Sequence, residues 1–309
     1  MVAYLILSYT QPELVRRLVS RLQGGVVAVH HDDRRCALGE VDAIRLPARP
    51  VEWGHGSQLA AILHCLRALR EHEWDWLVLL SGQDYPVRPV AEIEASLLAA
   101  DVDAFLRFRP VARVLRRGAV GEFARRYAYR WRPLGGRVAA AARLGAAPAA
   151  TAPDAAAPVP TSRLAARLAR LDPLVQVRTL PSGTYVGLPA QPPLPVFHGS
   201  DWFSLSRRAV DTVLAAPGTV VDHFLHTLIP TEAFVHTVLA NSSLRLANDH
   251  RRYAVFNPPS SPSPRVFGLA DVDEVLACGA DFARKFADVR VLDAIDRRVD
   301  GNREQGSSG

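Results

Sequence analysis

The sequence predicts an α/β protein with a Rossmann-like central sheet and flanking helices. Over the first hundred residues, short apolar and β-branched runs alternate with segments whose apolar residues recur at helical spacing. A strand, a helix and a second strand in succession are typical of a parallel sheet, because the helix carries the chain back across the face of the sheet. These two observations predict the fold class.

The predicted elements follow in order from the N-terminus. Residues 2–8 form an apolar run typical of a buried strand, residues 12–22 have helical spacing with Pro12 near the start, and residues 26–30 form a second strand. Apolar residues from Leu59 to Leu69 then predict a helix, and residues 76–80 a third strand. Ligands bind beyond the carboxyl ends of parallel strands, so residues 30–33 and 81–85 lie at the predicted ligand edge.

The second half of the chain follows an Ala/Pro-rich stretch. Residues 137–163 lack large apolar side chains, which predicts a mobile loop or linker there. Beyond it we expect helices near 207–215, after Thr231, after Ala270 and after Val289, with a short strand at 253–256. Residues 301–309 are rich in Gly and Ser and are expected to form a disordered tail.

Composition indicates a globular protein of 309 residues, 49% hydrophobic and 22% charged. No apolar run reaches the roughly 18–20 residues that span a bilayer, and the first residues lack a secretion signature. The three cysteines are far apart and contain no CxxC pair, so neither a disulfide framework nor a zinc site is indicated. We therefore expect no integral membrane segment and a cytoplasmic location. The arginine-rich, lysine-poor composition favours a bacterial source of high GC content.

The net charge of +6 favours an anionic ligand. Arginines are dense between Arg107 and Arg143, where aromatic residues separate them, and this mixture is compatible with single-stranded nucleic acid. No nucleic-acid-binding signature accompanies it. We favour a solvated basic helix, or a wall facing an anionic substrate, because charge runs usually lie on solvated faces.

One lysine stands out. All but one of the 37 basic residues are arginine, and the exception, Lys285, lies beside Arg284 and between Phe282 and Phe286. Lysine differs from arginine in presenting a compact point charge on a thin stem. Either an ammonium is required at this position, or the lysine is a chance survivor on the surface.

Several motifs resemble one family. Residues 51–54 (VEWG) and 79–86 (LLSGQDYP) resemble paired motifs of the core-2/I-branching N-acetylglucosaminyltransferases and peptide O-xylosyltransferases, glycosyltransferase family 14. Residues 199–203 (GSDWF), 230–239 (PTEAFVHTVL) and 282–286 (FARKF) follow in the family's order, closest to the xylosyltransferase side. The resemblance implies a GT-A-like nucleotide-sugar-binding fold, a UDP-sugar donor, inversion at the anomeric centre and no divalent metal.

The same resemblance organises the chain. It implies one glycosyltransferase domain over residues 1–300, with a nucleotide-binding half at 1–108 and an acceptor and catalytic half at 180–300. Arg284 and Lys285 take the family's phosphate-binding role, and Arg265 is a weaker candidate. Asp32 is expected at the ribose or uracil, and Asp201 and Trp202 on the acceptor side. His55 stands where the family often has glycine, and Trp53 is expected in the core.

The leaving diphosphate can be considered from the residues alone. Many sugar-nucleotide enzymes neutralise it with a metal held by Asp-x-Asp at a strand end. The corresponding residues 81–84 contain only one carboxylate, Asp84. The pairs Asp101/Asp103 and Asp271/Asp273 have the spacing, but two carboxylates alone are an incomplete ligand set. Without a metal, protein cations must offset the diphosphate, so no metal or other cofactor is expected.

The attacking hydroxyl must lose a proton, which requires a general base. Glu232 matches the family's catalytic glutamate; alternatively it is a helix-start acid behind a Thr231 cap, favoured by the helix dipole. The same position predicts a lowered pKa for Glu232. Asp84 is the second candidate for the base, or it caps the turn that follows its strand.

Two other functions remain open. His223, His226 and His236, with Glu232, have spacings that could hold a metal in a hydrolase, although Pro230 divides them between two elements. The arginine stretch could make a basic nucleic-acid-binding module. We favour an inverting, metal-independent transferase that moves a GlcNAc- or xylose-type sugar from UDP to a hydroxyl of a small-molecule or glycan acceptor, with no nucleic-acid partner. The sequence does not identify the donor sugar, the acceptor or the oligomeric state.

Overall fold

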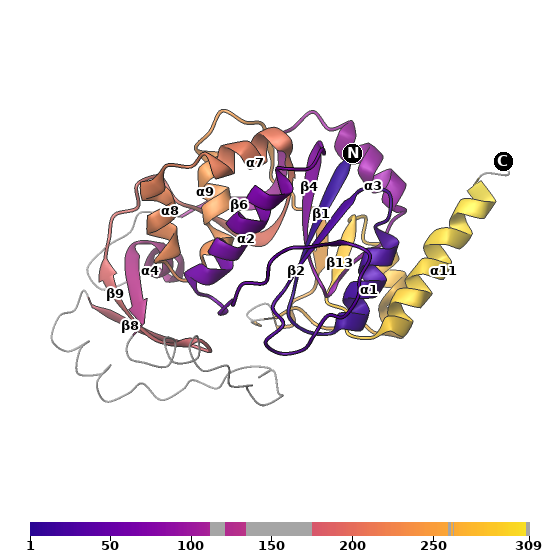
Figure 1. The fold of residues 1–309 in the computed structure, drawn as a ribbon, viewed down its shortest axis with the longest axis horizontal. Coiled ribbons are helices and arrows are strands. Elements are labelled where there is room, and N and C mark those ends of the chain that lie inside the picture. The colour runs from indigo at the N-terminus through magenta and orange to yellow at the C-terminus, as the bar shows by residue number, and fades with distance from the viewer. Residues whose placement is uncertain (112–120, 134–174, 259–260, 262, 307–309) are drawn as a thin grey trace.

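A mixed seven-stranded sheet forms the centre of the protein, with strand order β11-β6-β10-β4-β1-β2-β3 (Figure 1). The computed structural model describes residues 1–111, 121–133, 175–258, 261 and 263–306. The predicted loop at 137–163 lies outside these ranges. The α/β class with flanking helices is confirmed.

The first half of the chain builds the parallel part of this sheet. Strand β1 (Val2–Ser8) pairs in parallel with β2 (Val26–His31) and with β4 (Trp76–Ser81), and β2 pairs with β3 (Ile44–Arg45). Helices α1 (Pro12–Arg21) and α2 (Gly56–Leu69) provide crossovers between these strands. The three predicted strands and two predicted helices of this half are therefore present.

Strands from the second half complete the sheet. Strand β10 (Phe197–Ser206) inserts antiparallel between β4 and β6 (Ala104–Pro110), and β11 (Leu246–Ala247) pairs in parallel with β6. Residues from both halves thus share one sheet.

Alternate residues of β1 point to opposite faces of the sheet, as the strand repeat of two requires. Ala3 and Leu5 join the core under α2, α7 (Arg207–Leu214), α8 (Gly218–Leu225) and α9 (Phe234–Ala240). Tyr4 and Ile6 join the opposite core, under α1, α3 (Val90–Leu98), α10 (Val272–Leu276) and α11 (Val289–Gly306). Figure 1 shows α2, α7, α8 and α9 together on one side, with α1 and α11 on the other.

Two small sheets flank the large one. Strand β13 (Phe282–Arg284) lies between β12 (Arg252–Ala254) and β5 (Asp84–Pro86). The other small sheet consists of β7 (Tyr129–Pro133), β9 (Gly183–Pro189) and β8 (Gln176–Leu180), with the short helix α4 (Glu122–Tyr127) just before β7.

Three expectations differ from the structure. Helix α11 continues to Gly306, so residues 301–306 are not the expected disordered tail; a single glycine at 301 costs a helix only about 1 kcal/mol. The helix expected after Thr231 is a 3-10 turn, η1 (Pro230–Glu232), and α9 begins only at Phe234. Trp53 is 50% exposed instead of lying in the core, because it belongs to the loop before α2. Among the described helices, none has the length and apolar character needed to cross a bilayer.

Helix α2 begins at a point of close backbone contact. A Cβ atom built on Gly56 would lie 2.0 Å from the carbonyl oxygen of Leu225, at the end of α8. Only glycine fits there without movement of one helix. By contrast, a Cβ on Gly218, the first residue of α8, meets no atom within 4 Å.

We therefore expect Gly56→Ala to lower the free energy of unfolding by about 1–3 kcal/mol, the range for overpacked sites. Gly218→Ala is the matched control, because it also changes the first residue of a helix and should leave stability unchanged or slightly raised. Chemical denaturation of both variants measures the difference. Equal stability of the two variants would contradict the assigned packing of α2 against α8.

Candidate active site

Four strands end at one edge of the large sheet. Strands β1, β2 and β4 are parallel, and β6 runs with β4 because both are antiparallel to β10. Their carboxyl ends at Ser8, His31, Ser81 and Pro110 therefore meet the amino end of β10. This is the edge at which α/β sheets bind ligands.

A bulge in β10 places two predicted site residues at this edge. Gly199 pairs with Phe108 and Phe203 pairs with Leu106, so three residues of β10 stand opposite the single Arg107 of β6. Asp201 and Trp202 belong to this bulge. Bulges bend a strand and re-aim its side chains, and they are frequent beside active sites.

Glu232 reaches the same site from the turn η1. Ile229, just before the turn, has a left-handed backbone (φ 50°), and its N–H donates to the carbonyl of Gly54 at 2.8 Å. This bond ties the turn to the loop that precedes α2. Thr231 lies within the turn and does not cap a helix, contrary to the expectation.

Burial raises the pKa of Glu232 to about 7, and the negative charge of Asp201 adds to the rise. Arg126 opposes it, donating from Nη1 to Glu232 Oε2 at 2.8 Å. The lowered pKa predicted for Glu232 is therefore wrong. A turn of three residues has little dipole, and burial beside a second carboxylate outweighs it.

Asp201 is the second carboxylate of the site. Burial raises its pKa, although Thr231, Arg284 and Arg126 oppose the rise. Its Oδ1 is buried and has no hydrogen-bond partner among the described residues. Since like charges disfavour one another at short range, Asp201 and Glu232 compete for one proton.

His198 closes the site on the side of β10. Burial lowers the pKa of His198 to about 3, and the charges of Arg126 and Arg109 add to this effect. Its Nδ1 lies 3.2 Å from the Tyr127 hydroxyl and 3.8 Å from Glu232 Oε2. A neutral imidazole therefore stands beside Glu232.

Arg284 is held between an aromatic ring and a carboxylate. Its guanidinium carbon lies 4.2 Å from the ring centre of Trp202, and its Nε lies 3.6 Å from Asp84 Oδ1. The Asp84 side chain is fully buried and also accepts from the Ser81 N–H. Asp84 therefore orients Arg284 and caps its own turn, and it is not open to an acceptor.

Lys285 follows at the end of β13. The Phe286 N–H donates to the carbonyl of Gln83 at 3.0 Å, which holds the segment against the strand-end turn at 81–84. Lys285 Nζ lies 3.5 Å from Ser263 Oγ, and no carboxylate pairs with it among the described residues. Among the described residues, Arg284 thus lies beside a carboxylate, whereas Lys285 has only a hydroxyl nearby.

The profile of one protein family, described as Core-2/I-Branching enzyme, matches residues 2–108 and 161–276. The chain belongs to the Core-2/I-Branching enzyme family. This is a family of glycosyltransferases. The match includes the bulge of β10 and the turn of Glu232. It omits residues 109–160 and ends at residue 276, before Arg284 and Lys285.

Individual relatives of this Core-2/I-Branching chain are distant. Xylosyltransferase 1 of Homo sapiens is 27% identical over 287 residues, which cover 83% of this chain and 24% of that protein. Beta-glucuronosyltransferase GlcAT14A of Arabidopsis thaliana is 32% identical over 109 residues, 33% of this chain and 24% of that protein. The chain spans about a quarter of the length of these relatives.

Among solved structures, CMP:2-keto-3-deoxy-manno-octonic acid synthetase complexed with CTP covers 79% of this chain and 87% of its own, with 13% identity and a TM-score of 0.33. A TM-score this low does not establish a shared fold, so we assign the fold class from the strand order of the central sheet.

Asp32 and Arg265, which were also expected to bind the UDP-sugar donor, each pair with oppositely charged side chains of this chain. Asp32 accepts three hydrogen bonds from the Arg34 guanidinium and one from the Val51 N–H, at 3.0 Å. Despite burial, Arg34 and these bonds keep the pKa of Asp32 low. Arg265 pairs with Asp271 and Glu274, each at 2.6 Å. Within the described part of the chain, neither Asp32 nor Arg265 is hydrogen-bonded to Arg284 or Lys285.

The predicted histidine cluster does not assemble. His223 Nε2 lies 2.8 Å from the carbonyl of Tyr127, and His226 contacts Asp222 and Arg130. His236 is buried against Gly199, where an added Cβ would lie 2.7 Å from its ring. Within the described ranges no three His, Cys, Asp or Glu side chains could hold a metal ion together.

The Asp-x-Asp pairs also have other partners. Asp101 pairs with the Arg245 side chain, Asp103 accepts from the Arg245 N–H at 2.9 Å, and Asp271 pairs with Arg265. Within the arginine stretch, Arg126 and Arg130 pair with carboxylates of this chain. Those two arginines face protein acids; residues 112–120 and 134–143 lie outside the described ranges.

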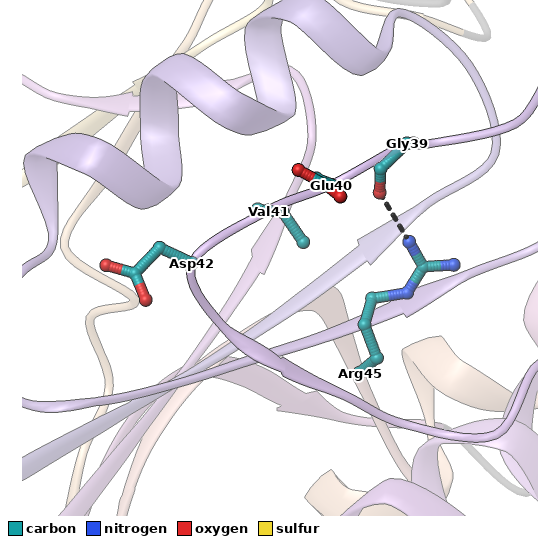
Figure 2. A pocket seen from close by; sticks show the side chains of 5 residues that line it. All are labelled: Gly39, Glu40, Val41, Asp42 and Arg45. Atoms are coloured by element: carbon teal, nitrogen blue, oxygen red, sulfur yellow. Dashed lines mark hydrogen bonds between the residues drawn. The ribbon is translucent and has the colours of Figure 1, made fainter.

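A pocket of about 550 Å³ lies in the loop between β2 and β3, and no residue of the candidate active site lines it (Figure 2). Gly39, Glu40, Val41, Asp42 and Arg45 line it, and Arg45 donates to the carbonyl of Gly39 at 3.1 Å. Two acids and one base, already hydrogen-bonded, make a poor site for a diphosphate.

The sequence did not single out Arg126 or His198 for the site. Arg126 was one of many arginines in its stretch, and His198 directly precedes a matched motif. Only the three-dimensional contact with Glu232 distinguishes them. The nearest available signal was the pattern of arginines and aromatics from Arg107 onward.

Proposed function

We propose that this chain is an inverting, metal-independent glycosyltransferase that moves a GlcNAc- or xylose-type sugar from UDP to a hydroxyl of a small-molecule or glycan acceptor. Membership of the Core-2/I-Branching family supports transfer of a sugar. The main support for the proposal is that the bulge of β10 lies next to both the proposed base, Glu232, and the proposed phosphate-binding residue Arg284. Asp201 interacts electrostatically with Glu232, and Trp202 contacts Arg284.

Glu232 is the proposed general base. Its carboxylate takes the proton from the acceptor hydroxyl while the oxygen forms a bond to C1 of the sugar and the bond from C1 to the diphosphate breaks. A base is most effective when its pKa lies near the working pH, and the pKa of about 7 meets that condition. The Glu232 side chain is 28% exposed, so a hydroxyl can approach it.

Lys285 is the proposed main contact of the leaving diphosphate. Arg284 is already engaged by Asp84 and Trp202, so it contributes charge from a fixed position. The Lys285 ammonium has only a long contact to Ser263 Oγ among the described residues, and it can turn toward a phosphate. Two cations at the strand end meet the charge that develops on the leaving group.

Lys285→Ala is expected to weaken UDP binding about 10- to 100-fold, since a hydrogen bond to a charged group contributes about 1.5–3 kcal/mol. Calorimetric titration with UDP measures this. Uridine is the internal control: it lacks the phosphates, so wild type and variant should bind it equally. Arg290→Ala removes a cation that is paired with Asp288 and 79% exposed, and it should leave UDP binding unchanged. UDP affinity equal to that of the wild type in Lys285→Ala would overturn the assignment.

Glu232→Gln is expected to reduce transfer about 10²- to 10⁴-fold, the usual contribution of a general base, while UDP binding stays intact. UDP release from UDP-xylose and UDP-GlcNAc, with water or added sugars as acceptors, measures the rate. The wild-type rate should persist in EDTA. Loss of activity in EDTA would contradict metal independence, and full activity in Glu232→Gln would exclude Glu232 as the base.

A further inference from the structure

Arg126 contacts the proposed base directly, yet it comes from outside the family match. It belongs to α4, in the stretch 109–160 that the Core-2/I-Branching profile omits. Its Nη1 donates to Glu232 Oε2 at 2.8 Å, and its side chain is 20% exposed. This segment of the chain therefore supplies a charge to a residue of the matched part.

Other side chains hold the Arg126 guanidinium in its position beside Glu232. Arg126 Nε lies 3.4 Å from Glu122 Oε1, and Glu122 in turn pairs with Arg178 of β8. The Arg126 guanidinium also lies 5.4 Å from the ring centre of Phe123, whose ring centre is 3.9 Å from that of His198. These contacts restrict where the guanidinium can lie.

The segment that carries Arg126 is fixed to α8. The carbonyl of Tyr127 lies 2.8 Å from His223 Nε2, and the Trp131 N–H donates to the carbonyl of His226 at 2.7 Å. Arg130 pairs with Asp222 at 2.6 Å. The histidines that resembled a metal site thus anchor the segment that presents Arg126.

We propose that Arg126 is a positioning residue that holds the Glu232 carboxylate in place and ready to accept the proton from the acceptor hydroxyl. This inference rests on the proposed function of Glu232. A carboxylate with one oxygen bonded to a guanidinium keeps the other oxygen free for the incoming hydroxyl.

The charged groups around Glu232 define the effect. Asp201 and neutral His198 face it from β10, and Arg126 and Tyr127 from α4; Arg284 acts on Asp201. Burial and Asp201 favour protonated Glu232, and Arg126 favours the carboxylate. Removing Arg126 therefore raises the pKa of Glu232, so a higher pH is needed to ionise the base.

Arg126→Gln is expected to move the acidic limb of the kcat profile to higher pH by about 1–3 units, the usual influence of an adjacent opposite charge. Above that limb, kcat should recover toward the wild-type value, while KM for the UDP-sugar changes little. Arg126→Lys should restore part of the shift. UDP release from UDP-xylose and UDP-GlcNAc gives the profile, and infrared titration of the Glu232 carboxyl gives the same shift without substrate.

Arg130→Gln is the matched control. It loosens the same segment from α8 without touching Glu232, so it should lower stability and leave the acidic limb in place. An acidic limb that stays in place in Arg126→Gln, or an equal shift in Arg130→Gln, would overturn the inference. Full activity in Glu232→Gln would instead refute the proposed base, so the two failures are distinguishable.

Discussion

The bulge in β10 is the constraint on which the site depends. Three residues opposite Arg107 turn Asp201 and Trp202 toward the edge where the parallel strands end. Trp202 then provides a ring for Arg284, and Asp201 provides a negative charge beside Glu232. Gly199 makes the bulge possible, because a Cβ there would lie 1.7 Å from the carbonyl of Arg107.

Charge burial at this edge follows a consistent pattern. Three acidic residues at this edge each pair with an arginine: Asp84 with Arg284, Asp32 with Arg34, and Glu232 with Arg126. The arginine fork suits such sites because it gives several donors in fixed geometry. Lys285 differs, since among the described residues its ammonium has only a hydroxyl contact. The ammonium of this single lysine is therefore available for the proposed contact with the diphosphate.

The sequence predicted the strands and helices of the first half of the fold, and its motifs predicted the family to which the chain belongs. Apolar runs such as residues 2–8 and 76–80 are buried on both faces, so their pattern is strong. The mixed character of the sheet was not predictable, because the insertion of β10 between β4 and β6 is a long-range pairing. The raised pKa of Glu232 also depends on burial and on Asp201, thirty-one positions earlier in the chain. The spacing of His223, His226 and His236 indicated a cluster. Only tertiary contacts show that His223 and His226 have other partners and that His236 is buried against Gly199.

Glu232 is partly buried beside Asp201, and we expect its carboxyl to titrate near neutrality. Infrared difference spectroscopy of wild type against Glu232→Gln, recorded over a pH series, follows this carboxyl directly. We expect a midpoint near pH 7 in the wild type and a lower midpoint in Asp201→Asn, which removes the neighbouring charge. A midpoint near the ordinary glutamate value of 4.5 in both proteins would contradict it.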